Sequence, residues 1–165
     1  MSTVTVTNTT NFSGLSLFGI NLINFTNTAP RILVTATFAS NQFNDAQISN
    51  SVTINGSAGR NGVIVNGPDI NAAGWLFTNW ASADSVTLNG TAGADTIHGS
   101  SQADRINGNA GADLIIGGLG ADKIFAGDGE DEIRYVSDAE VAANEVIDGG
   151  NDHDWLILEG PEGAT

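Results

Sequence analysis

Five aspartates follow one another at intervals of nine residues in the C-terminal half of the chain. They are Asp95, Asp104, Asp113, Asp122 and Asp131, and an isoleucine follows each of them two residues later. Each ends a turn that follows the pattern G-x-x-G-x-D-x-I-x, except that Gln102 and Ala126 each replace one of the pattern's glycines. Carboxylates that recur with turn glycines at a fixed period can bind a hard cation, which prefers oxygen ligands. The repeat is therefore the part of the chain whose residue types and spacing could bind a metal ion.

One nine-residue unit already indicates the elements that position these carboxylates. Glycines at its first, second and fourth places permit a tight turn. Its last three residues, such as 96–98, are expected to form a short strand whose middle side chain faces inward. Two units then make one coil, with the isoleucines between two parallel sheets, and alternate turns stack about 4.8 Å apart. One column of carboxylates would hold Asp95, Asp113 and Asp131, and the other Asp104 and Asp122.

Stacked carboxylates would oppose folding unless a cation lay between them. Two carboxylates about 5 Å apart repel by about 3 kcal/mol at an effective dielectric constant near 20. A calcium ion midway between turns about 4.8 Å apart can touch oxygens of both, because Ca–O distances are about 2.3–2.6 Å. Magnesium fits this spacing less well, and a chain with no Cys and 2 His is a poor zinc ligand. The sequence therefore predicts bound Ca²⁺, about three to five ions.

The expected ligands are aspartate carboxylates and the backbone of the turn glycines. The aspartates are Asp84, Asp95, Asp104, Asp113, Asp122, Asp131 and Asp154. The glycines are Gly90, Gly93, Gly99, Gly108, Gly111, Gly117, Gly120, Gly127, Gly129 and Gly149.

The pattern lapses at several places, each of which carries an expectation. Residues 56–64 read as a degenerate copy with Asn61 where aspartate belongs, so a coil without metal is expected there. Asp84 ends a further incomplete copy and could align with Asp104. An insertion over 135–148 interrupts the repeat before a last copy at 149–157. Across it, Asp131 is expected to share an ion with Asp154.

The same insertion leaves the partner of Asp122 open. If residues 146–147 form the next strand, then residues 138–145 replace one turn in the column of Asp122. Asp138 or Glu140 could then face Asp122 and help to hold an ion.

Composition excludes several classes of function. The formal net charge is −14, and residues 81–165 hold 17 acids against 3 bases, which argues against nucleic acid or an anionic membrane surface as a partner. The chain lacks cysteine, a G-x-S-x-G motif and a long apolar run, so neither a thiol or serine active site nor a membrane span is expected. We predict no catalytic residues and no enzyme activity.

The N-terminal part has different chemistry from the repeat. Residues 1–80 carry no net charge, and alternating apolar and polar residues at 4–7 and 31–38 predict strands. We expect an all-β solenoid with a Thr/Asn-rich N-terminal β cap over 1–50 and degenerate, metal-poor coils over 51–83. A calcium-binding roll over 84–158 and a tail over 159–165 would follow.

The segments 90–134 and 149–157 resemble the hemolysin-type (RTX) calcium-binding nonapeptide repeat. The resemblance implies a right-handed parallel β-roll that orders when calcium binds, within a larger bacterial protein secreted by a type I-like route. Because the family's repeats occur in toxins, proteases, lipases and adhesins, the repeat identifies a module and no single activity.

One alternative from another class stays open. The chain could be a carbohydrate-binding or adhesive module in which calcium is only structural and a polysaccharide, or a neighbouring domain of the parent protein, is the partner.

Overall fold

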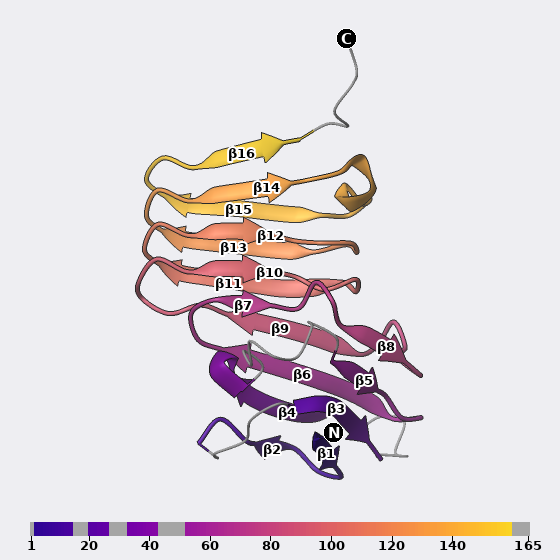
Figure 1. Ribbon diagram of the computed structural model, residues 1–165. Coiled ribbons are helices and arrows are strands. Elements are labelled where there is room, and N and C mark those ends of the chain that lie inside the picture. Colours follow the sequence, from indigo (N-terminus) through magenta and orange to yellow (C-terminus); the bar gives the residue numbers. More distant parts are fainter. Residues whose placement is uncertain (1, 15–19, 27–32, 43–51, 160–165) are drawn as a thin grey trace. The chain divides into compact units, whose positions relative to one another are not determined.

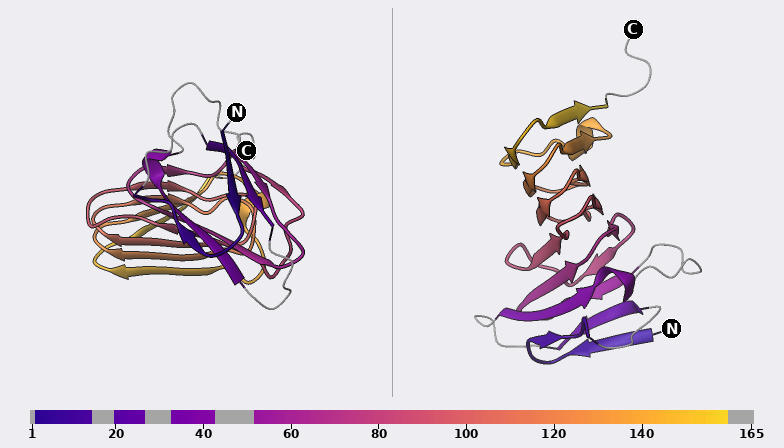
Figure 2. Two further views of the ribbon diagram at one scale, coloured as in Figure 1. Left: turned by 90° about the horizontal axis from the view of Figure 1, so that it is seen from below. Right: turned by 90° about the vertical axis from the view of Figure 1, so that its left-hand side faces the viewer.

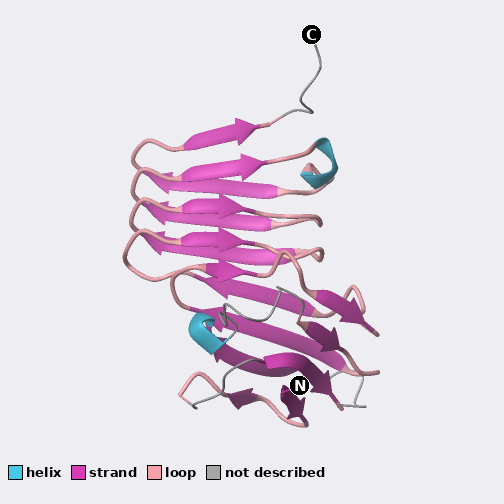
Figure 3. Ribbon diagram, in the orientation of Figure 1, coloured by secondary structure: helices cyan, strands magenta, loops and turns pink. Residues whose placement is uncertain are grey.

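The computed structural model describes residues 2–14, 20–26, 33–42 and 52–159, and almost all of its regular structure is β-strand (Figure 3). Two short 3₁₀ turns, η1 (Ser40–Gln42) and η2 (Asp138–Glu140), are the helical elements of the described ranges. No helix in those ranges is long and apolar enough to cross a membrane. The strands are β1 (Ser2–Val6), β2 (Thr10–Asn11), β3 (Ile20–Phe25), β4 (Leu33–Ala39), β5 (Thr53–Asn55), β6 (Arg60–Asn66), β7 (Ile70–Asn71), β8 (Leu76–Thr78), β9 (Ser85–Asn89), β10 (Thr96–His98), β11 (Asp104–Ala110), β12 (Leu114–Ile116), β13 (Lys123–Asp128), β14 (Glu132–Tyr135), β15 (Val146–Asn151) and β16 (Trp155–Leu158).

Residues 1–67 and 74–87 form one compact unit. Within it β1, β3, β5 and β8 are parallel neighbours in one sheet, and β2, β4 and β6 are parallel neighbours in another (Figure 1). Strand β4 buries Val34, Ala36 and Phe38, the alternate residues that the sequence pattern places on one face. The strands expected near residues 4–7 and 31–38 are therefore confirmed as β1 and β4.

The expected division of the chain at residue 50 stays a prediction. The described N-terminal strands pair in parallel with strands that follow them, as β3 does with β5 and β4 does with β6. Residues 43–51 of the expected cap and its boundary, and residues 160–165 of the expected tail, lie outside the described residues.

Residues 68–73 and 88–165 form a second compact unit, which contains the repeat. Strands β7, β10, β12, β14 and β16 follow one another in one parallel sheet, and β11, β13 and β15 in the other. The register pairs Ile97 with Ile115 and Ile106 with Ile124, in each case 18 residues apart. Successive coils from β10 to β16 lie one above the other in the right-hand view of Figure 2. The predicted parallel β-roll, with two units to a coil, is confirmed.

The repeat isoleucines form the core between the two sheets. Their side chains are 0–2% exposed, and the residues on either side of each one are only half buried or exposed. Burying one such side chain contributes about 1.5–3 kcal/mol, so each coil has a thin core. At the last coil Leu156 takes the isoleucine position and is 53% exposed. The side chains of Ile97, Ile106, Ile115 and Ile124 are 0% exposed, and that of Ile133 is 2% exposed.

The insertion lengthens one coil without changing the sheets on either side of it. After Tyr135 the chain leaves β14, makes the single 3₁₀ turn η2 and returns as β15 at Val146. Ile147 pairs with Ile124, now 23 residues earlier. The strand expected at residues 146–147 is therefore confirmed.

Candidate metal centre

The first column of aspartates lies at the turns that follow β9, β11, β13 and β15. One type of hydrogen bond links its members: the backbone N–H of one aspartate donates to Oδ1 of the aspartate one coil later. The N···O distance is 2.8 Å from Asp95 to Asp113, 2.9 Å from Asp113 to Asp131 and 3.2 Å from Asp131 to Asp154. The predicted stacking of this column is therefore seen, and Asp131 contacts Asp154. That these two residues share one ion stays a prediction.

The second column continues into the insertion through a glutamate. The N–H of Asp104 donates to Oδ1 of Asp122 at 2.8 Å, and the N–H of Asp122 donates to Oε1 of Glu145 at 3.2 Å. The sequence analysis proposed Asp138 or Glu140 as the group that faces Asp122, whereas this hydrogen bond is made by Glu145. The carboxylate of Glu140 does lie near enough to contribute to the raised pKa of Asp122, and its help in holding an ion stays a prediction. Glu145 directly precedes β15, whose Val146 pairs with Lys123, so Glu145 comes opposite Asp122.

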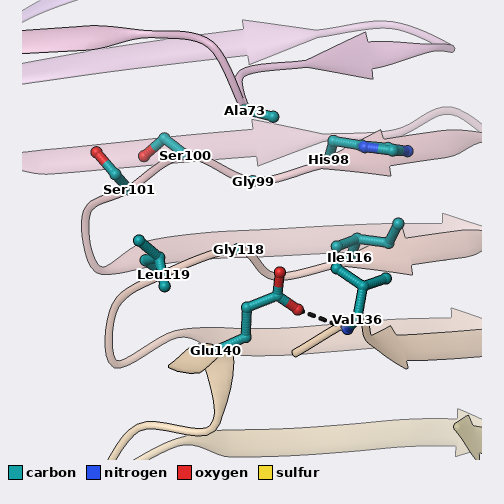
Figure 4. Close-up of a pocket in the computed structure, with 10 residues that line it drawn as sticks. All are labelled: Ala73, His98, Gly99, Ser100, Ser101, Ile116, Gly118, Leu119, Val136 and Glu140. Atoms are coloured by element: carbon teal, nitrogen blue, oxygen red, sulfur yellow. Dashed lines mark hydrogen bonds between the residues drawn. The ribbon is translucent and has the colours of Figure 1, made fainter. Parts of the chain in front are cut away.

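Two further groups of the insertion hold its carboxylates in place. Oε2 of Glu140 accepts a hydrogen bond from the N–H of Val136 at 2.7 Å, beside an apolar groove that Ile116 helps to line (Figure 4). The Tyr135 hydroxyl donates to Oε2 of Glu145. Burial, and then this carboxylate, raise the pKa of Tyr135, which therefore stays protonated as a donor. The sequence analysis missed both Tyr135 and Glu145.

From residue 108 onward the turns use left-handed backbone at their second and fourth places. The second-place φ values are 80° at Asn109, 88° at Gly118, 122° at Gly127 and 97° at Gly150, and the fourth-place values are 113° at Gly111, 130° at Gly120, 131° at Gly129 and 78° at Asp152. Stacked turns also approach closely, since a Cβ added to Gly127 would lie 1.9 Å from the carbonyl oxygen of Asn109. Glycine satisfies both demands at this position.

The glycines at the first place of the turns leave room for the carboxylate. A Cβ added to one of them would lie 2.3–2.9 Å from Oδ2 of the aspartate in the same turn. Gly93, at a fourth place, has no comparable neighbour and no positive φ. The first-place glycines are Gly90, Gly99, Gly108, Gly117 and Gly149.

The repeat carboxylates are almost completely buried, and burial raises their pKa values. The five aspartates of the regular repeat are 0–3% exposed. Desolvation, with a smaller contribution from neighbouring carboxylates, raises the pKa of Asp113 to about 6 and that of Asp122 to about 7. The pKa values of Asp104 and Asp131 are raised for the same reasons. Without a cation, the folded columns therefore disfavour the charged form that exists in water at neutral pH.

Three buried carboxylate oxygens accept no hydrogen bond from the described residues: Oδ2 of Asp113, of Asp122 and of Asp131. A buried, unpaired anionic oxygen is costly, and a cation satisfies it. Within the described ranges no three acidic or histidine side chains converge as a metal-binding group. A cation at these oxygens would therefore take the rest of its ligands from the turn backbone, and calcium accepts such mixed carboxylate and carbonyl sets. The residues present fit Ca²⁺.

The degenerate copy in the first unit has the same hydrogen bond from one coil to the next, but the amide of Asn61 occupies the place of the repeat aspartate. The N–H of Asn61 donates to Oδ1 of Asp84 at 2.8 Å. The Nδ2 of Asn61 lies 3.1 Å from Oδ2 of Asp84, 3.1 Å from the carbonyl oxygen of Gly59 and 3.4 Å from that of Ser57. A protein donor thus contacts two turn carbonyls and the carboxylate one coil later. The predicted alignment of Asp84 with Asp104 joins residues of different units and stays a prediction.

Comparison with known families gives one match. A family model described as the RTX calcium-binding nonapeptide repeat, in four copies, matches residues 87–115 and 98–133. Comparisons with curated proteins and with solved structures gave no match. The matched residues contain all five aspartates of the regular repeat and strands β10 to β13. The chain therefore carries RTX calcium-binding nonapeptide repeats, and residues 87–133 of its β-roll belong to that repeat family.

Proposed function

We propose that this chain is a calcium-binding module whose repeat block folds when Ca²⁺ enters the spaces between stacked turns. The observation that carries the proposal is the set of three buried Oδ2 atoms, on Asp113, Asp122 and Asp131, that accept no hydrogen bond from the described residues. Each belongs to a column of carboxylates that repel one another. A divalent cation converts this repulsion into attraction and supplies the missing partner.

The Asn61 contacts indicate which oxygens would hold the ion. Counted by position in the repeat, they are the carbonyls of the second and fourth places of one turn and the carboxylate one coil later. For Asp131 the corresponding carbonyls belong to Asn109 and Gly111. In the repeat an aspartate takes the place of Asn61, so a second carboxylate stands where Asn61 supplies its NH₂ group. The positive charge that neutralises the two carboxylates must therefore come from outside the chain.

The chemistry of binding explains where such a module would work. Extracellular calcium modules commonly bind at about 10⁻⁴–10⁻³ M, so the columns would stay repulsive at low calcium and become compact at high calcium. RTX repeats typically occur in secreted proteins. We propose that this chain acts outside the cell, as part of a larger secreted bacterial protein that leaves by a type I-like route, and that it binds rather than catalyses.

A carbohydrate-binding role has one observation in its favour. Trp155 is 49% exposed and lines a groove with Asp113 and Glu132, whereas Trp75 is buried. Retention of the wild-type chain, but not of Trp155→Ala, on an immobilised polysaccharide in the presence of calcium would support this role. Equal retention or equal loss of both would remove Trp155 as a glycan platform.

Circular dichroism in calcium and in excess chelator tests the proposed function. We expect the strand signal to fall in chelator and to return when calcium is added. Magnesium at the same concentration is the matched control, and it should restore much less signal because it is smaller and retains its water ligands. A spectrum that is the same in chelator and in calcium would contradict calcium-driven folding.

A further inference from the structure

Two of the five repeat aspartates differ from the others in their hydrogen bonds. Oδ2 of Asp95 accepts the N–H of Thr91 at 2.5 Å, and the Thr91 hydroxyl lies 3.0 Å from Oδ1 of the same carboxylate. Asp104 has the same arrangement with Ser100, at 2.5 Å to the N–H and 3.0 Å to the hydroxyl. Both carboxylate oxygens of these two aspartates are thus paired with donors from their own turns.

The residue at the second place of the turn explains the difference. Thr91 and Ser100 occupy that place with negative φ, whereas the later turns have left-handed backbone there and again at the fourth place. In the extended form the second-place N–H faces the carboxylate, and a hydroxyl side chain adds a second donor. In the later turns Oδ2 of Asp113, Asp122 and Asp131 receives neither.

Asparagine side chains supply further hydrogen-bond donors near the earlier aspartates, including one at the turn of residues 90–95. The Nδ2 of Asn109 donates to the carbonyl oxygen of Gly90 at 2.9 Å. In the first unit, Asn61 likewise supplies donors to the carboxylate of Asp84. The chain therefore provides hydrogen-bond donors of its own to both carboxylate oxygens of Asp84, Asp95 and Asp104, and leaves Oδ2 of the three later carboxylates without a donor from the described residues.

We propose that Thr91 and Ser100 cap Asp95 and Asp104 in place of calcium, so that these two aspartates are structural and only the later carboxylates are calcium ligands. The proposal rests on the proposed function, because it divides the repeat aspartates into those that bind the ion and those that do not. Calcium dependence then begins at Asp113, although the nonapeptide spacing begins at Asp95.

Isothermal titration with calcium separates the two groups of carboxylates. We expect Asp95→Asn and Asp104→Asn to keep the wild-type number of bound ions, because an asparagine can still accept the N–H of Thr91 or Ser100. We expect Asp113→Asn, Asp122→Asn and Asp131→Asn each to lose at least one ion or to weaken binding at least tenfold. Loss of an ion in Asp95→Asn or Asp104→Asn would overturn the proposal while leaving the calcium function intact. A wild-type chain that binds no calcium would instead overturn the proposed function.

A gain-of-binding variant keeps the test independent of variants that fail to fold. Thr91→Gly removes the hydroxyl and gives residues 90–95 the full G-G-x-G-x-D turn, so we expect Asp95 to become a ligand and the number of bound ions to rise by one. Thr91→Ala is the matched control, because it keeps the backbone cap and should leave that number unchanged. An unchanged count in Thr91→Gly, with the calcium-loaded fold confirmed by circular dichroism, would contradict the capping role of Thr91.

Discussion

Replacing Asp131 by asparagine should have opposite effects with and without calcium. Asp131 lies between Asp113 and Asp154 in its column, and the ladder places each of these carboxylates one coil away. Each neighbour contributes a repulsion of about 3 kcal/mol at about 5 Å before screening. Burial, and to a smaller extent neighbouring carboxylates, raise the pKa values of Asp113 and Asp131. In chelator we therefore expect Asp131→Asn to stabilise the roll by at least about 1 kcal/mol at pH 7.5.

In calcium the same substitution removes a charged ligand. We expect the free calcium concentration at the folding midpoint to rise at least tenfold, which corresponds to about 1.4 kcal/mol. Circular dichroism measures both effects, with calcium as the titrant in one series and a folding osmolyte in chelator as the titrant in the other. Asp128→Asn is the matched control, since Asp128 is in the same turn and exposed. If Asp131→Asn were no easier to fold in chelator than the wild-type chain, repulsion within the column would not be the origin of calcium dependence.

The other predictions concern protons, a glycine and the core. The folded pKa values of Asp113 and Asp122, about 6 and about 7, lie above their unfolded values. The roll in chelator should therefore be most stable near pH 4 and lose stability as the pH rises through 6 to 7. Thermal melts in chelator at several pH values measure this, and a roll that is more stable at pH 8 than at pH 5 would contradict it. Gly127→Ala should lower the free energy of unfolding by at least about 1–2 kcal/mol, because φ is 122° and the added Cβ would meet a carbonyl oxygen. Urea unfolding in calcium measures this, with Gly93→Ala as the control because Gly93 has no positive φ, and equal midpoints for the two variants would refute the argument. Ile115→Ala should lower the free energy of unfolding by about 2–5 kcal/mol, because Ile115 is fully buried. Ile116→Ala should lower it much less, because Ile116 is only half buried, and the same urea experiment compares the two variants.

The nine-residue period was sufficient to predict the regular part of the fold. A strand of three residues with one inward isoleucine, repeated without a slip, requires two units to a coil, and the observed pairing of Ile97 with Ile115 follows from it. The columns of aspartates follow from the same count. The N-terminal strands were predicted as strands, but their parallel pairing was not, because alternation of polar and apolar residues does not distinguish parallel from antiparallel neighbours.

The candidate site was less predictable because it depends on turn backbone and on the insertion. Glu145 was missed since the insertion hides the register, yet Glu145 and Ile147 keep the repeat's acid-x-isoleucine spacing, with glutamate in place of aspartate. The sequence analysis gave no role to Thr91 and Ser100, which stand at the second place of their turns. Their hydrogen bonds to Asp95 and Asp104 depend on the sign of φ, which the residue type favours but does not determine.

Aspartate has to serve two purposes in the turns of Asp113, Asp122 and Asp131, and this explains why asparagine does not replace it there. One oxygen, Oδ1, accepts the N–H of the preceding coil and fixes the stacking, as it does between Asp113 and Asp131. The other, Oδ2, has no donor within the described chain. An asparagine could accept the same ladder bond, but it would then present an NH₂ group where the cation needs an oxygen. Asn61 presents its NH₂ to Asp84 in this way. The strands and the isoleucine core are the same whichever residue is chosen, so the residues at the second and sixth places of each turn decide whether a coil is held by its own hydrogen bonds or by calcium.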